Sequence, residues 1–153
     1  MDDEYDCLPC PAGKYCAGAG LSAPTGDCAP GYYCSRGAYS DKPKPEVNGT
    51  DFYSVNTSTC PIYSLNSTGD ICSPGEYCPE GSEYPLPCPP GEYCEIFGLG
   101  TPSGLCEAGF YCSGNATQRD PITCSEGHYC PEGTTIEVAC PPGTYSGMIV
   151  LNW

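Results

Sequence analysis

Residues 88–94 read Cys88-Pro89-Pro90-Gly91-Glu92-Tyr93-Cys94, and this seven-residue motif decides the fold. The pattern of Cys, two residues, Gly, one residue, Tyr and Cys occurs six times, and a seventh copy ends in Ser146 instead of Cys. The seven copies begin at Cys10, Cys28, Cys72, Cys88, Cys106, Cys124 and Cys140. Self-similarity at this stringency predicts a tandem array of short repeats, numbered 1 to 7 below.

Each motif specifies a tight turn followed by extended chain. The Gly supplies the positive φ that such a turn needs. The Tyr is predicted to be extended and to lay its ring across a neighbouring disulfide, in place of an aliphatic core. No stretch shows helical periodicity over a useful length. The predicted fold class is therefore small and disulfide-rich, an elongated tandem array of short β-ribbon and turn repeats with little or no helix.

The composition supports stabilisation by disulfides. The chain has 15 Cys, 20 Gly and 18 Pro among 153 residues, and it is poor in large aliphatic side chains. Burial of so few aliphatic groups cannot offset the entropy of ordering the backbone, roughly 1–2 kcal/mol per residue. Cysteine at this density is typical of oxidised extracellular proteins. This composition argues against an ordinary α/β or helical enzyme and against a cytosolic protein.

The charge excludes two further classes of partner. The net charge is −14, with only five Lys and Arg. Nucleic acids and anionic membranes both require clustered basic residues, so neither is a predicted partner. No stretch approaches the ~20 consecutive apolar residues of a membrane span, so no span is predicted in this chain.

The spacing of the motifs is interrupted once, which divides the chain into three parts. The predicted parts are repeats at 1–34, a glycosylated insert at 35–71, and further repeats at 72–153, of which the last is incomplete. The insert contains Lys42-Pro43-Lys44-Pro45 and then chain rich in Ser, Thr and Asn. This composition predicts a solvated, sugar-coated excursion, with a disordered linker as the alternative.

Four of the five Asn residues begin an Asn-X-Ser/Thr sequon, which predicts N-linked glycans. The predicted acceptors are Asn48, Asn56, Asn66 and Asn115. Sequons and cysteines together predict an extracellular or cell-surface location.

Two disulfide pairings fit the cysteine spacing, and the sequence does not choose between them. The favoured pairing joins each motif to the next: Cys16–Cys28, Cys34–Cys72, Cys78–Cys88, Cys94–Cys106, Cys112–Cys124 and Cys130–Cys140. The other pairing closes each motif on itself, as in Cys10–Cys16 and Cys28–Cys34. All thirteen of these motif cysteines are expected to join disulfides, whereas Cys7 and Cys60 lie outside the repeat register.

The residues around the second cysteine extend the motif. They read Tyr77-Cys78-Pro79-Glu80-Gly81-Ser82 and Tyr129-Cys130-Pro131-Glu132-Gly133-Thr134, and the last copy reads Cys140-Pro141-Pro142-Gly143-Thr144-Tyr145. Over residues 7–34 and 72–146 this pattern resembles the ephrin-receptor-like cysteine-rich repeat, which is itself similar to the modules of tumour necrosis factor receptors. The resemblance implies a rod-like extracellular array without catalytic residues. The extra Cys after each Tyr departs from simpler members, so their disulfide pairing is not carried over.

Candidate catalytic and metal-binding groups are scarce. His128 is the only histidine and occupies the variable slot of its motif, so a surface position is expected and an enzyme is not. Hard carboxylates such as Asp2, Asp3, Glu4 and Asp6 suit Ca²⁺, but no EF-hand spacing exists. A solvated acidic surface is the favoured interpretation, and no cofactor is predicted.

The predicted function is a non-enzymatic, glycosylated protomer of an extracellular fibre, surface appendage or matrix. The alternative is a ligand-binding or adhesion segment of a receptor ectodomain. Head-to-tail contact with other copies is expected because the C-terminal segment is the most apolar part of the chain. The predicted interface comprises Tyr145, Met148, Ile149, Val150, Leu151 and Trp153, meeting another copy near residues 5–16.

Overall fold

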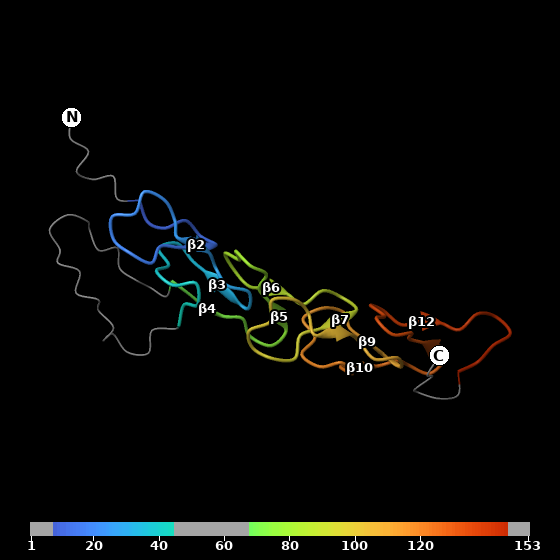
Figure 1. The fold of residues 1–153 in the computed structure, drawn as a ribbon. Helices are drawn as coiled ribbons and strands as arrows, with labels where there is room; N and C mark the ends of the chain where they lie inside the picture. Colours follow the sequence, from blue (N-terminus) through green and yellow to red (C-terminus); the bar gives the residue numbers. More distant parts are fainter. Residues whose placement is uncertain (1–7, 45–67, 147–153) are drawn as a thin grey trace.

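A computed structural model describes residues 8–44 and 68–146, which form an elongated row of two-stranded ribbons (Figure 1). Within these residues there is no helix, and every ribbon is antiparallel. The predicted fold class is confirmed. It follows that no described segment forms a helix of the length and apolarity required to cross a membrane.

The first strand of each ribbon begins directly after the motif Gly and includes the motif Tyr, and the residues before the next motif form the second strand. The pairs are β1 (Lys14–Tyr15) with β2 (Gly26–Asp27), β3 (Tyr32–Cys34) with β4 (Gly69–Ile71), β5 (Glu76–Tyr77) with β6 (Leu86–Pro87), β7 (Glu92–Tyr93) with β8 (Gly104–Leu105), β9 (Phe110–Tyr111) with β10 (Ile122–Thr123), and β11 (His128–Tyr129) with β12 (Val138–Ala139). Each ribbon therefore joins one repeat to the next.

Every described disulfide closes a motif on itself, so the favoured pairing between motifs is wrong. The bridges are Cys10–Cys16, Cys28–Cys34, Cys72–Cys78, Cys88–Cys94, Cys106–Cys112 and Cys124–Cys130. The turn brings the two Cα atoms of each motif to within 5.8–6.2 Å, a separation that a disulfide spans.

Cys140 is a correction to the expectation that all motif cysteines form bridges. It is a free cysteine in the described part of the chain. The physical reason is that Ser146 occupies the position six residues later, where every complete motif has its second Cys.

Backbone hydrogen bonds between successive motifs form a continuous series that we call the backbone ladder. Between repeats 1 and 2, Gly13 N–H donates to Cys34 O at 2.8 Å, and Gly37 N–H donates back to Cys10 O at 2.8 Å. Cys28 N–H also donates to Gly13 O at 2.9 Å. The same three bonds recur at each junction up to that of repeats 5 and 6, where Gly109 N–H donates to Cys130 O. Because the bonded groups are the cysteines and turn residues, the ladder attaches directly to the disulfides.

Turn glycines also approach the repeat after next. A Cβ added at Gly91 would lie 2.5 Å from Gly133 O, and one at Gly13 would lie 2.5 Å from Gly81 O. Both glycines have positive φ, 83° and 79°. The backbone of repeat n therefore packs against that of repeat n+2 where a side chain would not fit.

The insert begins later than the sequence predicts. Ala38 is buried and its carbonyl accepts from Cys16 N–H at 2.9 Å, and β4 at the far end pairs with β3. The described flanks, 35–44 and 68–71, thus belong to the repeat array. Residues 45–67 lie outside the described residues, as do Cys60 and the acceptors Asn48, Asn56 and Asn66.

The core consists of disulfides covered by tyrosine rings, as predicted. Tyr15 packs against the buried Cys28 and Cys34, and Tyr93 packs against the buried Cys106 and Cys112. In each pair the Tyr of one repeat covers the disulfide of the next. An aromatic ring over a bridge replaces the aliphatic packing that the composition lacks.

Replacing Tyr93 with Ala should destabilise repeats 4 and 5 by about 2 kcal/mol. The expected cost is below the 3–5 kcal/mol typical of a fully buried aromatic, because Tyr93 is only partly buried. The matched control is Tyr145→Ala, because the Tyr145 side chain is 90% exposed. Urea denaturation of both variants measures the difference, and an equal effect would contradict the packing role of Tyr93.

Candidate functional site

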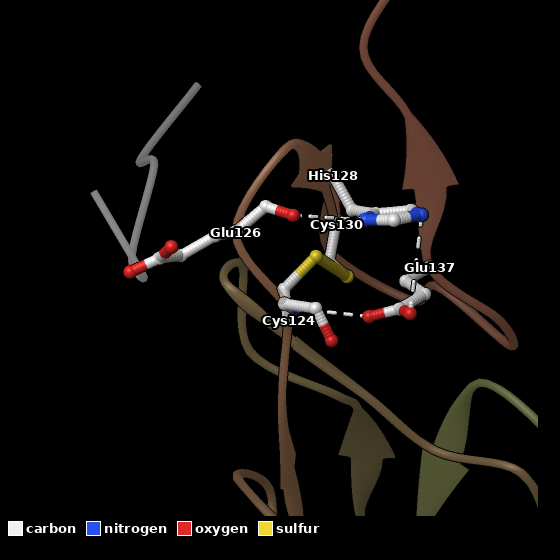
Figure 2. A network of polar contacts seen from close by, with 6 residues as sticks. Cys124, Glu126, His128, Cys130 and Glu137 are labelled. Atoms are coloured by element: carbon white, nitrogen blue, oxygen red, sulfur yellow. Dashed lines mark hydrogen bonds and ion pairs between the residues drawn. A yellow bond between two sulfur atoms is a disulfide. The ribbon is translucent and has the colours of Figure 1, made fainter. Parts of the chain in front are cut away.

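The only histidine lies in a small polar network on the ribbon of β11 and β12 (Figure 2). His128 Nε2 lies 4.0 Å from Glu137 Oε1, and His128 Nδ1 lies 3.2 Å from Glu126 O. Ser125 N–H donates to Glu137 Oε2 at 2.9 Å. The Cys124–Cys130 disulfide lies beside these groups, so turn and bridge position the network.

Hydrogen bonds to its carboxylate hold the pKa of Glu137 below the ordinary value. The largest cause is the backbone bond from Ser125, followed by a bond from the Ser125 side chain, while nearby His128 lowers the pKa slightly. In a nucleophilic triad a serine hydroxyl donates to the imidazole. Here the two ring nitrogens of His128 lie near Glu126 O and Glu137 Oε1 instead.

Glu137 should titrate below the ordinary glutamate range in a carbon-detected NMR titration. A depressed folded-state pKa contributes stability above the unfolded pKa of about 4.3, and this contribution is lost as the pH falls through the folded value. Acid should therefore loosen the ribbon of β11 and β12. In a His128→Ala variant the pKa should stay low, because Ser125 is the main cause. Titration of Glu137 at or above its ordinary value would contradict this account.

Sequence reasoning identified His128 and counted Glu137 among the acidic residues of the repeats, but it did not pair the two. The missing information is the antiparallel register, in which His128 pairs with Ala139 and Tyr129 with Val138. That register brings the residue just before β12 to the side of β11. The only signal in the sequence was the place of His128 in the variable slot of its motif. That slot carries no information about which residue lies on the opposite strand.

Asn115 is the one predicted glycan acceptor within the described residues, and it is exposed. Most of the predicted head-to-tail interface lies outside the described residues: Met148, Ile149, Val150, Leu151 and Trp153 are not described, and neither is Cys7. Tyr145 is described and highly exposed. Contact of the C-terminal segment with another copy stays a prediction.

The described residues contain no group of three or more His, Cys, Asp or Glu side chains placed to hold a metal ion. The acidic N-terminal residues Asp2, Asp3, Glu4 and Asp6 lie outside the described range. The expectation of no cofactor therefore stays a prediction.

The chain is similar to short stretches of much longer ABC transporters. It is 25% identical over 143 residues to white-brown complex homolog protein 30 of Arabidopsis thaliana, which covers 74% of this chain and 12% of that protein. It is 35% identical over 88 residues to ABC transporter G family member 25 of rice, Oryza sativa subsp. japonica, covering 48% of this chain and 9% of the relative. It is 33% identical over 78 residues to the ABC-type transporter claG of Penicillium crustosum, covering 48% and 9%. The chain thus spans about a tenth of the length of these relatives.

No family model matches the chain, so the resemblance to ephrin-receptor-like repeats stays a prediction. The relatives overturn the function predicted from the sequence. The prediction of an extracellular fibre, appendage or matrix protomer is wrong, and so is the alternative of a receptor ectodomain, because three of the four matching proteins are named as ABC transporters and the fourth as a white-brown complex homolog. Repeat and disulfide patterns report how a segment is stabilised, and they do not report which protein carries it. That this chain is not an enzyme stays a prediction.

Proposed function

We propose that this chain is a cysteine-rich spacer segment of an ABC-type transporter, located on the extracytoplasmic side of the membrane. The observation that carries the proposal is the similarity to transporters over only 9–12% of their length. A segment of this size, without a membrane-crossing helix in its described residues, fits a part that lies outside the bilayer.

The disulfides support the extracytoplasmic side. Six bridges lie within the described residues, and all but one of the twelve bonded cysteines are buried. Disulfides persist in the secretory pathway and outside the cell, whereas the cytosol keeps thiols reduced. The cysteines of this array therefore need the oxidising side to form their bridges.

The geometry supports a spacer rather than a substrate-binding role. Two depressions on the described surface are open to solvent, one around Pro74 and Asn115 and the other around Pro79 and Tyr84. Small-molecule sites are normally concave and bury most of the ligand. A backbone ladder that connects successive repeats instead favours a stiff element whose length is set by the number of repeats.

Protease protection of the full-length protein in sealed microsomes tests the location. The array should resist a glutamate-specific protease until detergent opens the vesicles, and alkylation before and after reduction should find the six bridges oxidised. Cleavage of the array in sealed vesicles, with its cysteines free, would overturn the proposal. A cytosolic loop of the same transporter serves as the control for protease activity.

Deletion of residues 106–123 tests the spacer role. This deletion removes one whole repeat and leaves Cys124 at the point where Cys106 stood, so the motif sequence continues unbroken. Small-angle scattering of the isolated secreted segment should show a shorter maximum dimension with the remaining disulfides intact. A globally unfolded or unshortened deletion variant would contradict a modular spacer.

A further inference from the structure

Asn115 occupies a position that is glycine in the other repeats of the backbone ladder. Its N–H donates to Cys88 O at 2.9 Å. The corresponding donors at other junctions are Gly37, Gly81, Gly98 and Gly133. All four glycines have positive φ, and Asn115, at φ 53°, is the only described non-glycine residue that does. The array therefore places a side chain at a turn that elsewhere has none.

That side chain is available for modification. Asn115 and Thr117 are both exposed, while Ala116 between them is buried. Ala116 O accepts from Cys94 N–H at 2.8 Å. The backbone of the sequon is therefore held by one bond from the N–H of Asn115 and by another to the carbonyl of the next residue. Among the described residues, no hydrogen bond to the Asn115 side-chain amide is found. After glycine, Asn is one of the residues that most readily tolerate a left-handed turn, so an acceptor amide fits this site without disrupting the repeat.

We propose that Asn115 carries an N-linked glycan that covers the depression between repeats 3 and 5. The depression is open and is lined by Ser73, Pro74, Gly75, Glu76, Pro87 and Asn115. Two proline rings offer apolar surface to the C–H faces of a sugar, and Ser73 and Glu76 offer polar groups to its hydroxyls and acetamide. The first sugars of a glycan on Asn115 would therefore lie against repeat 3 rather than extend freely.

The modification is a transfer from an oligosaccharide carried on a lipid diphosphate. A bond forms between Nδ2 of Asn115 and the anomeric carbon of N-acetylglucosamine. The bond from that carbon to the diphosphate oxygen breaks, the lipid diphosphate leaves with the electron pair, and the amide loses one proton to a base. The secretory pathway supplies this donor, so the proposal rests on the proposed extracytoplasmic location. It adds that the face of repeats 3 to 5 around Asn115 points to solvent and does not contact the rest of the transporter.

The test is peptide mass spectrometry of the full-length protein from eukaryotic cells, after enzymatic release of N-glycans in heavy-oxygen water. We expect the label, on an aspartate at position 115, in the unmodified sequence and in Thr117→Ser, which keeps the sequon. Thr117→Ala and Asn115→Gly should both lose the modification and keep the fold. Thr117 is exposed, and four other repeats have glycine at the position of Asn115. Hydrogen exchange in the peptide around Pro74 to Glu76 should be slower in the glycosylated form than in Thr117→Ala.

The outcomes separate this inference from the proposed function. An unmodified Asn115 in protein whose six disulfides are oxidised would overturn the glycan and leave the location intact. An unmodified Asn115 with free cysteines would overturn both. A glycan at Asn115 without slower exchange around Pro74 would overturn its placement in the depression.

Discussion

Complete reduction should unfold the repeat array, with loss of its β signal in circular dichroism and of its resistance to proteases. Each described bridge closes a loop between cysteines six positions apart, and loop-closure entropy assigns about 2 kcal/mol to a loop of this size. Six such bridges contribute on the order of 12–14 kcal/mol. That sum is as large as the whole stability of an ordinary domain, about 5–15 kcal/mol, and the array has no aliphatic core to compensate for its loss.

Single bridges provide a graded version of the same experiment. The double variant Cys88→Ser, Cys94→Ser should lose about 2 kcal/mol of its free energy of unfolding. Hydrogen exchange should become faster mainly in the ribbons that flank repeat 4. The matched control is Cys140→Ser, because Cys140 forms no disulfide with the described cysteines. Denaturation in urea and hydrogen exchange measure both. An array that keeps its protease resistance in strong reductant would show that the disulfides are not its main support.

Replacing Gly91 with Ala should be among the most damaging single substitutions in the array, with an expected cost of about 3–5 kcal/mol. A positive φ alone costs an L-residue roughly 1–2 kcal/mol, and φ of Gly91 is 83°. The added Cβ would also lie 2.5 Å from Gly133 O, so one backbone must move. Movement of Gly91 breaks its bonds to Cys112 O and from Cys106 N–H, each worth about 1 kcal/mol.

Gly127 is the matched control, because it occupies the same motif position with φ of 77° and an added Cβ there meets nothing within 4 Å. The Gly127→Ala variant should lose only the free energy that an L-residue costs at positive φ, about 1–2 kcal/mol. The difference between the two variants in denaturation midpoint therefore isolates the contact between repeats 4 and 6. An equal loss of stability in the two variants would mean that the backbones of repeats 4 and 6 are not in close contact.

The motif was sufficient to predict the repeats and their turns, because both depend on residues within seven positions of each other. The tyrosine packing was predictable because a disulfide of the next repeat follows the ring in the sequence, as Cys28 and Cys34 follow Tyr15. Disulfide pairing was not predictable, since cysteines of the same motif and of adjacent motifs are both close enough in sequence. What decides it is the distance between cysteines in the fold: the turn brings the two Cα atoms of one motif to within 5.8–6.2 Å, a separation that a disulfide spans. Spacing along the sequence does not give that distance.

The candidate sites show the same limit. The sequon at Asn115 was visible, and Asn115 follows Cys112 by three positions, as Gly37, Gly81 and Gly133 follow their own cysteines. Its left-handed backbone, φ 53°, was not predicted, because only the structure shows that Asn115 makes the same backbone bond as those glycines. The contact of Glu137 with Ser125 depends on ribbon register. Local motifs thus identified residues with reactive or modifiable side chains, such as His128 and Asn115. Which residues lie beside them is determined by the pairing of strands and repeats.

Closure of every described disulfide within one motif has a consequence for biosynthesis. A bridge between cysteines six positions apart needs no later part of the chain, so each motif is able to oxidise before the next one is synthesised. The pairing between motifs would have required a cysteine to wait for a partner still being synthesised. Short loops close within about 10–100 ns, far faster than the 5–20 residues per second of translation. The array is thus suited to folding from its N-terminal end during synthesis. Each repeat that has formed its disulfide presents backbone groups to which the next repeat is able to bond.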